Sequence, residues 1–250
     1  MIIDCHCHAG KGDGLTGPWD TDAPLDNYNK WAAEAGIDKT VLFAAFNSDF
    51  SRANYQVAKI VNAAPEKYFG FAFVNATKDA GRIFQMVNTA VKDYGFCGIK
   101  VHRYYSGISR EVCEAARKYH LPVLYDVMGE IAQIDLFASE YPDVSFIIPH
   151  LGSFADDWKA QLAFLSPLER FPNVYTDLSG VRRFDLIESA YKRAGPDKIL
   201  FGSDGPWIHP GIELAKIYAL HPDENSLNKM LSRNFLKLIR NVQQKKLSYA

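Results

Sequence analysis

The sequence predicts a (β/α)8 barrel, in which eight parallel strands form a closed sheet with helices outside it. Short apolar runs alternate with stretches of helical periodicity along the whole chain, and this unbroken alternation indicates parallel strands. Eight such units fit a length of 250 residues, which favours closure into a barrel over an open sheet. Some runs are apolar at consecutive positions, as in Phe146-Ile147-Ile148, which is typical of strands covered on both faces.

The first strand is the apolar run that ends at the His-x-His pair, His6 and His8. A glycine-rich stretch over 9–21 follows without a helix starting at once, so it lacks the dinucleotide-binding fingerprint and is expected to be a mobile loop over the site. Helical spacing then begins at Leu25 and stops at Gly36. Further strands are expected at 40–45, 68–74 and 98–102, alternating with helices around 55–61 and 83–91.

The second half of the chain continues the same alternation. Its expected helices span 110–119, 131–141, 158–169 and 184–194, and its expected strands span 122–126, 144–150, 174–178 and 198–203. A helical region around 214–239 follows the last strand. The sequence contains no linker, low-complexity tract or repeat of fixed length, so residues 1–250 are expected to form a single domain.

Composition argues against several classes of protein. A net charge of -1 and an isoelectric point near 6.7 disfavour a nucleic-acid-binding surface, which needs clustered lysine and arginine. No run approaches about 20 apolar residues and no cleavable leader is visible, so we expect a cytoplasmic protein without a membrane span. Cys5 and Cys7 alternate with the two histidines, but Cys97 and Cys113 supply no second pair for a zinc knuckle. Packing as small apolar side chains is the expected role of the thiols.

Polar residues close most of the expected strands. Functional groups of such a barrel gather at the carboxyl ends of its strands, so these residues are expected to surround one opening. They are His6 and His8 on the first strand, Lys100 and His102 on the fourth, Asp126 on the fifth, His150 on the sixth, Asp177 on the seventh and Asp204 on the eighth. His6 and His8 share a face because strand side chains alternate. With Asp204 they offer the donors of a catalytic divalent metal, zinc first and manganese or iron as alternatives.

Several strings resemble the amidohydrolase-related (amidohydrolase 2) family, which belongs to a superfamily of metal-dependent barrel enzymes. They are Ile3-Asp4-Cys5-His6-Cys7-His8, His150-Leu151-Gly152, Val174-Tyr175-Thr176-Asp177-Leu178-Ser179, Leu200-Phe201-Gly202-Ser203-Asp204-Gly205-Pro206 and Asn234-Phe235-Leu236. The resemblance implies His6 and His8 as metal ligands, Asp204 as ligand or general base, and His150 as ligand or catalytic imidazole. Hydrolases and decarboxylases both occur in the family, so the resemblance leaves the reaction open.

The fifth strand departs from the family pattern. Leu121-Pro122-Val123-Leu124-Tyr125-Asp126 carries a carboxylate where the family has a metal-binding histidine. Asp126 is kept as a candidate ligand, because oxygen donors suit zinc and suit manganese or iron better. The alternative is that the metal is weakly held or absent.

Five further residues at the strand ends are candidates for substrate binding. They are Lys100, His102, Arg103, Trp207 and His209. Lys100 could bind a substrate carboxylate, pair with Asp126, or become carboxylated and bridge two metals as in some members of the superfamily. Arg103 could hold an anionic group through its guanidinium. For His209, placement in a turn is an equally good explanation.

We therefore expect a metal-dependent hydrolase that acts on a small amide, lactone or ester through metal-activated water. The first alternative is a metal-dependent decarboxylase of a small carboxylic acid, which Lys100 or Arg103 pointing inward would favour. A TatD-like nuclease is a further alternative, although the fourth strand lacks the acidic ligand of that group. The last is a barrel whose site has decayed into a small-molecule binding module. The expected partner is a small-molecule substrate, and a homo-oligomer is an option that no motif decides.

Overall fold

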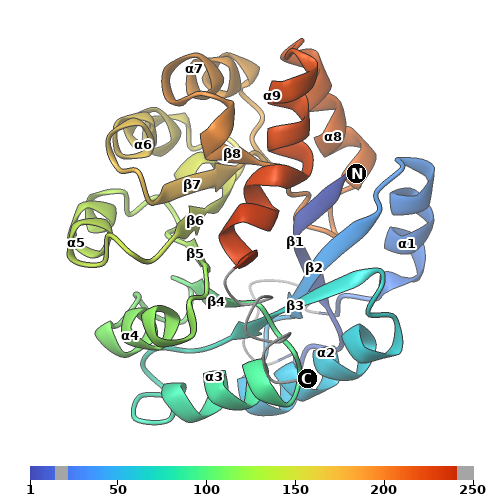
Figure 1. Cartoon of the computed structure of the whole chain (residues 1–250), viewed down its shortest axis with the longest axis vertical. Coiled ribbons are helices and arrows are strands. Elements are labelled where there is room, and N and C mark those ends of the chain that lie inside the picture. The colour runs from blue at the N-terminus through green and yellow to red at the C-terminus, as the bar shows by residue number, and fades with distance from the viewer. Residues whose placement is uncertain (15–21, 241–250) are drawn as a thin grey trace.

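The strands form a parallel barrel in which neighbours in sequence are also neighbours in space. The computed structural model describes residues 1–14 and 22–240. Within these ranges, eight strands pair in the order β1 to β8, each parallel to the next. They are β1 (Ile3–Ala9), β2 (Lys39–Ala44), β3 (Tyr68–Phe73), β4 (Gly98–His102), β5 (Val123–Asp126), β6 (Phe146–Ile148), β7 (Val174–Asp177) and β8 (Ile199–Leu200). The predicted (β/α)8 barrel is therefore confirmed, with its strands at the centre of Figure 1.

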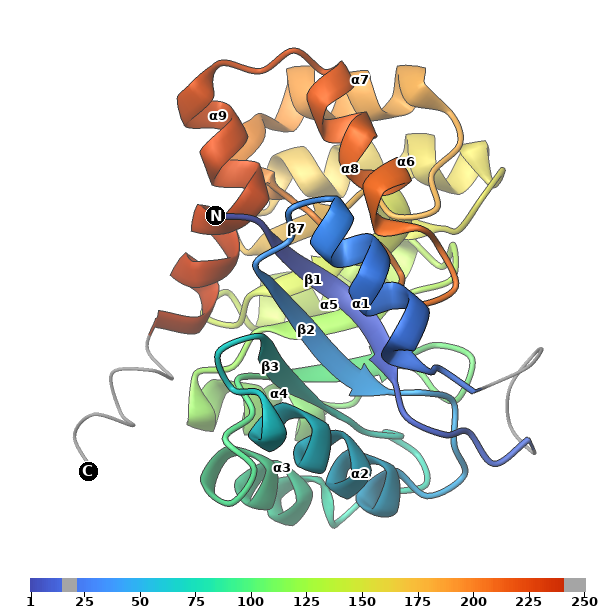
Figure 2. The same ribbon diagram turned by 90° about the vertical axis from the view of Figure 1, so that its right-hand side faces the viewer.

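Helices alternate with the strands and cover the outside of the barrel, as Figures 1 and 2 show. They are α1 (Leu25–Glu34), α2 (Phe50–Ala63), α3 (Ile83–Lys92), α4 (Arg110–Tyr119), α5 (Ala132–Glu140), α6 (Trp158–Arg170), α7 (Phe184–Ala194), α8 (Pro210–Ala219) and α9 (Glu224–Asn228). A π-helical turn, Lys229–Arg233, continues α9 into a last helical segment over 234–240. Across the described part of the chain, no helix is both long and apolar enough to cross a membrane. Of the predicted loop over 9–21, residues 15–21 lie outside the described residues.

The barrel closes between β8 and β1, and this seam differs from a regular strand pair. The Cys5 N–H donates to the Phe201 carbonyl oxygen over 2.9 Å. Pairing of β8 with β7 ends at Leu200, so the strand predicted over 198–203 is much shorter than expected. The reason is that the Phe201 N–H donates to the Met230 carbonyl oxygen in the C-terminal helical segment over 2.9 Å. Residues 201–205 are consequently free to form an irregular loop beside β1.

Asp4 fastens this seam with both of its carboxylate oxygens. Oδ1 accepts the backbone N–H groups of His6, at 3.1 Å, and Ser203, at 2.9 Å. Oδ2 accepts the Ser203 hydroxyl and, at 2.7 Å, the hydroxyl of Tyr28 on α1. Burial raises the pKa of Asp4 to about 6, and these four hydrogen bonds oppose the increase. Asp4 thus joins the first strand, the loop after the last strand and the first helix.

A β-bulge interrupts the alternation of β1. Its pairing with β2 shifts register between Asp4 and Cys7, which shows that an extra residue is accommodated there. His6 and His8 nevertheless face a common region, because their ring centres are 5.9 Å apart. The thiols pack as predicted, since all four cysteines are buried.

Candidate metal centre

Two imidazoles from β1 have one ring nitrogen fixed by the protein. His6 Nδ1 lies 2.9 Å from Asp177 Oδ2, and His8 Nδ1 lies 3.0 Å from the Ala44 carbonyl oxygen. Carboxylate and carbonyl oxygens only accept, so each neutral ring carries its proton on Nδ1. Nε2 of each ring therefore presents a lone pair, which is the form of imidazole that binds metal.

Asp204 completes a group of three donors with His6 and His8. It follows β8 in a left-handed conformation, with φ +58°, and its Oδ1 lies 3.2 Å from His6 Nε2 and 3.7 Å from His8 Nε2. One atom of each side chain lies within 4.8 Å of the other two. Among the described residues His6 Nε2 has no hydrogen-bond partner, although Asp204 Oδ1 lies beside it. A buried nitrogen without a partner is unfavourable, so this donor set fits a divalent cation.

The protonation states of these side chains suit a cation. Burial lowers the pKa of His6 to about 4, aided by the charge of Lys100. Burial also lowers the pKa of His8 well below its usual value. Both imidazoles are therefore neutral near physiological pH, as metal binding requires. Burial raises the pKa of Asp204 to about 7, so a bound cation would stabilise its carboxylate form.

Asp177 ends β7 and organises the surroundings of two imidazoles. Besides His6 Nδ1, it binds the backbone N–H groups of Ser179, at 3.0 Å, and His150, at 3.4 Å, through Oδ1. Burial raises the pKa of Asp177, but its interactions with His6 and His150 hold this pKa well below the usual range. Its strand-end position is visible in the sequence, and it lies in one of the strings that resemble the family.

His150 lies on a turn and not on a strand. The strand predicted over 144–150 spans only Phe146–Ile148, because Pro149 has no N–H with which to continue the ladder. The chain then enters a short 3-10 turn, Pro149–Gly152, in which His150 has a left-handed conformation with φ 60°. This turn directs the His150 ring into the barrel, where it is buried.

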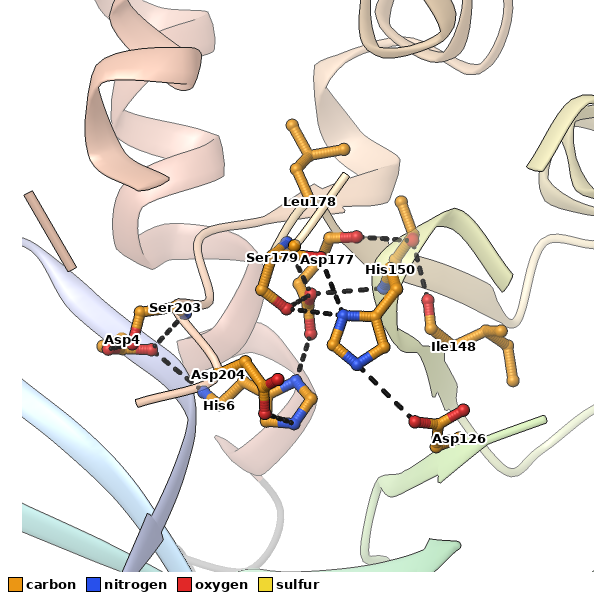
Figure 3. Close-up of polar contacts among 12 residues, drawn as sticks. Asp4, His6, Asp126, Ile148, His150, Asp177, Leu178, Ser179, Ser203 and Asp204 are labelled. Carbon is orange, nitrogen blue, oxygen red and sulfur yellow. Dashed lines mark hydrogen bonds and ion pairs between the residues drawn. The ribbon is translucent and has the colours of Figure 1, made fainter. Parts of the chain in front are cut away.

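The His150 ring is held at both nitrogens, as Figure 3 shows. Nδ1 donates to the Ser179 carbonyl oxygen at 2.7 Å, and Nε2 lies 3.5 Å from Asp126 Oδ2. Burial lowers the pKa of His150, but the interaction with Asp126 and the charge of Asp204 outweigh burial and raise the pKa to about 9. Oxygen acceptors at both nitrogens favour the cationic form of His150, whose ring centre lies 5.1 Å from that of His6.

Asp126 and His102 lie together on neighbouring strands, β5 and β4. Asp126 Oδ2 is 3.2 Å from His102 Nε2, and Asp126 Oδ1 accepts the Met128 N–H at 2.9 Å. Burial raises the pKa of Asp126, but its interactions with His102 and His150 hold this pKa well below its usual value. Within the described residues, two groups of three side chains have ligand atoms within 4.8 Å of one another, His6, His8 and Asp204, and His6, His150 and Asp177, and neither includes Asp126. The structure thus brings Asp126 to the site, but beside two imidazoles.

Lys100 is buried inside the barrel on β4. Its Nζ lies 4.9 Å from the centre of the Phe43 ring and has no hydrogen-bond partner among the described residues. Burial lowers the pKa of Lys100, whereas the charges of Asp126, Asp204 and Asp177 raise it. The Lys100 amino group is therefore buried without a direct hydrogen-bond partner among the described residues.

Aromatic rings line the outer part of the site around Phe46, which follows β2. The Phe46 ring centre lies 5.5 Å from that of His8, 5.2 Å from that of His102 and 6.1 Å from that of Trp207. Trp207 also lies 4.7 Å from His8 and is 36% exposed. The structure therefore brings Trp207 to the site, as expected, and adds Phe46, which no sequence motif indicates.

Arg103 and His209 have other partners. Arg103 forms an ion pair of 2.8 Å with Glu130, and both side chains are partly exposed. His209 caps α8, where its Nδ1 accepts the Gly211 N–H at 3.1 Å, and its ring packs 4.9 Å from that of Trp31 on α1. The turn placement that the sequence left open accounts for His209, which the structure does not bring to the donor group.

Solved structures of several enzymes share this fold. A dihydroxybenzoic acid decarboxylase from Polaromonas sp. JS666, with bound manganese and an inhibitor, is 16% identical over 96% of each chain with a TM-score of 0.69. A 4-oxalomesaconate hydratase from Rhodopseudomonas palustris is 17% identical over 100% of this chain and 98% of its own, with a TM-score of 0.70. A probable 2-pyrone-4,6-dicarboxylic acid hydrolase from Acinetobacter baumannii is 16% identical over 96% of this chain and 99% of its own, with a TM-score of 0.75. These likenesses show the fold alone.

A family model gives a more specific result. No curated protein matches the chain. The model of the amidohydrolase family, however, matches residues 3–240. The matched range includes β1, β8 and all three donors described above. This match agrees with the motifs of the sequence and shows that the chain belongs to the amidohydrolase (amidohydrolase 2) family.

Proposed function

We propose that this protein is a metal-dependent hydrolase that acts on a small amide, lactone or ester. The observation that carries the proposal is the group formed by His6, His8 and Asp204, whose donor atoms lie within 4.8 Å of one another. It includes a buried nitrogen, His6 Nε2, that no described residue satisfies. Three protein donors leave a coordination position open, as a catalytic site requires. Zinc suits this donor set best, with manganese and iron as alternatives.

The chain's own residues would carry the proton transfers. A divalent ion held by this group would lower the pKa of water and polarise a substrate carbonyl. Asp204 directs Oδ1 toward both imidazoles, which leaves Oδ2 to take a proton from the attacking water. The His150 ring is fixed through Nδ1 by the Ser179 carbonyl oxygen, and its Nε2 lies 3.5 Å from Asp126 Oδ2, so a leaving group would take the Nε2 proton in place of this contact with Asp126.

The aromatic lining supports a small, planar substrate. Phe46 and Trp207 lie roughly parallel, with 20° between their planes, and both adjoin His8. Aromatic faces pack favourably on flat unsaturated groups. A conjugated lactone or an aromatic ester would place its ring against these side chains and its carbonyl near the donor group.

Elemental analysis of purified, untagged protein tests the metal. After supply of zinc, manganese and iron in turn, we expect about one ion per chain, and we expect His6→Ala to lose this ion because one of three donors is removed. His221→Asn, at an exposed position after α8, is the control and should retain the ion. Wild-type protein that retains no stoichiometric metal, or a His6→Ala protein with full metal content, would contradict the proposal.

Decarboxylation of a small carboxylic acid is the second candidate reaction, and Lys100 is the observation that favours it. Its buried amine lacks a direct partner among the described residues, and a substrate carboxylate would supply one. Arg103, by contrast, already pairs with Glu130. Product analysis separates the two reactions, since a hydrolysed lactone gains water whereas a decarboxylated acid releases carbon dioxide. Candidate lactones and aromatic acids should be tested side by side.

A further inference from the structure

Asp126 has both carboxylate oxygens committed to partners inside the protein. Oδ1 accepts the Met128 N–H at 2.9 Å. Oδ2 lies 3.2 Å from His102 Nε2 and 3.5 Å from His150 Nε2. In Figure 3 the His150 ring lies between Ser179 and Asp126 and directs one nitrogen toward each. The carboxylate therefore bridges two imidazoles from different strands of the barrel.

The proton positions on these imidazoles follow from their other ring nitrogens. His102 Nδ1 accepts the Tyr104 N–H at 3.1 Å, so the ring proton of neutral His102 is on Nε2 and points at Asp126. His150 Nδ1 faces the Ser179 carbonyl oxygen at 2.7 Å and must carry a proton. His150 Nε2 faces Asp126 Oδ2 at 3.5 Å, and because a carboxylate oxygen only accepts, Nε2 carries a proton in this pairing. Two N–H groups thus converge on one oxygen of Asp126.

This arrangement explains why a carboxylate occupies the end of β5. An ionised carboxylate oxygen can accept two hydrogen bonds, whereas a neutral histidine offers a single acceptor nitrogen. The side chains of His102, His150 and Asp126 are only 11%, 3% and 9% exposed, so an N–H left without its acceptor would be costly. An aspartate at position 126 therefore provides the acceptor that the N–H groups of His102 and His150 both need.

We propose that Asp126 is a positioning residue, which holds His102 and His150 beside the group His6, His8 and Asp204, and that it is not itself a metal ligand. The inference rests on the proposed function, which identifies that group as the metal site. His150 lies 5.1 Å from His6, and His102 lies 5.2 Å from Phe46, measured between ring centres. Asp126 accordingly links a deep imidazole beside the donors to an outer imidazole beside the aromatic lining.

Binding of Co²⁺ and Mn²⁺ to Asp126→Asn tests whether Asp126 is a ligand. Asparagine preserves the shape of the side chain, and the visible spectrum of Co²⁺ reports the atoms that bind it. We expect Asp126→Asn to bind both ions within about threefold of wild type and to leave the Co²⁺ spectrum unchanged, because no donor is lost. Asp204→Asn is the matched control at a donor, and should bind at least about tenfold more weakly with an altered spectrum.

Imidazole nitrogen NMR of metal-free protein tests the positioning role. Asp126→Asn should shift the Nε2 signals of His102 and His150, because both lose their charged acceptor, and should leave that of His8 in place. If this variant does not fold, His102→Gln carries the test, and should shift the His150 signal while retaining Co²⁺ binding. Loss of Co²⁺ binding in either folded variant, or an unchanged His150 signal, would overturn the inference. A wild-type protein that binds neither ion would refute the proposed function, while the NMR comparison would still decide the role of Asp126.

Discussion

Replacement of Asp177 by asparagine should weaken metal binding through the tautomer of His6. Asp177 Oδ2 accepts the His6 Nδ1 proton at 2.9 Å, which leaves the Nε2 lone pair facing Asp204. Asp177 Oδ1 binds the backbone N–H groups of Ser179, at 3.0 Å, and His150, at 3.4 Å. Asparagine can keep its oxygen on these two N–H groups only by turning its NH₂ group toward His6 Nδ1. That donor would move the ring proton to Nε2 and block the nitrogen that is proposed to bind metal.

The size of the effect follows from the hydrogen bond that metal binding would then break. To bind metal through His6 Nε2, the variant must break the hydrogen bond from the asparagine NH₂ group to His6 Nδ1. It also lacks the hydrogen bond from His6 Nδ1 to a charged carboxylate that wild type has. A hydrogen bond to a charged group contributes about 1.5–3 kcal/mol, which corresponds to roughly tenfold to hundredfold in affinity. The same range is typical when a carboxylate behind a metal-binding histidine is removed. We therefore expect Asp177→Asn to bind zinc roughly 10–100 times more weakly than wild type.

Competition of the protein with a chelator of known zinc affinity measures this change. Asp185→Asn is the matched control, because Asp185 is an exposed carboxylate on α7 that pairs with Arg183 at 2.6 Å. It should bind zinc as wild type does. If folded Asp177→Asn binds zinc within about threefold of wild type, the tautomer reasoning is wrong.

Three further predictions concern stability and reactivity. Burial raises the pKa of Asp4 from 3.8 to about 6, so its contribution to the free energy of unfolding is present below the lower value and is lost as pH rises through the higher one. In denaturant titrations of metal-free protein, the free energy of unfolding of wild type should therefore decrease more, between these two pH values, than that of Asp4→Asn. Gly98→Ala should lower the free energy of unfolding by about 1–3 kcal/mol, because its Cβ would lie 2.4 Å from the Phe71 ring. Gly107→Ala, whose Cβ would have only ordinary contacts, should leave the thermal midpoint nearly unchanged. Burial raises the pKa of Cys113 to about 12, so its thiolate is scarce near neutral pH. A thiol reagent should therefore label Cys113 only after unfolding. Rapid labelling of Cys113 in native protein would contradict its burial.

The strand ends are the part of the site that sequence predicts best. The regular spacing of the apolar runs along the sequence predicts where each strand lies. In a parallel barrel the carboxyl ends of all strands reach the same opening. Asp204 is far in sequence from His6 and His8, yet this rule alone brings it to them, and the structure places the three donor atoms within 4.8 Å of one another. The predicted strand over 98–102 likewise matches β4 residue for residue. Local patterns suffice here because they depend on one strand at a time.

Contacts between strands and turns are the part that the sequence does not reveal. Pro149 ends β6 early, so His150 reaches Ser179 and Asp126 from a turn. The partner of each ring nitrogen depends on the conformation of such turns, which no periodicity encodes. Phe46 shows the same limit, because only the folded barrel reveals that its ring adjoins His8. The bridging role of Asp126 could likewise be inferred only from its contacts with His102 and His150 in the folded barrel.

The anchoring of the imidazoles separates a chemical role from a structural one. His6 and His8 are held through Nδ1 by acceptors on β7 and β2, which leaves each Nε2 directed at Asp204. His209 differs, because its Nδ1 accepts a backbone N–H and its ring packs on Trp31, which is sufficient for a helix cap. A buried histidine that only stabilised the fold would have both ring nitrogens satisfied. His6 Nε2 is buried and unsatisfied by any described residue, so the fold accepts a local cost that the proposed metal ion would remove.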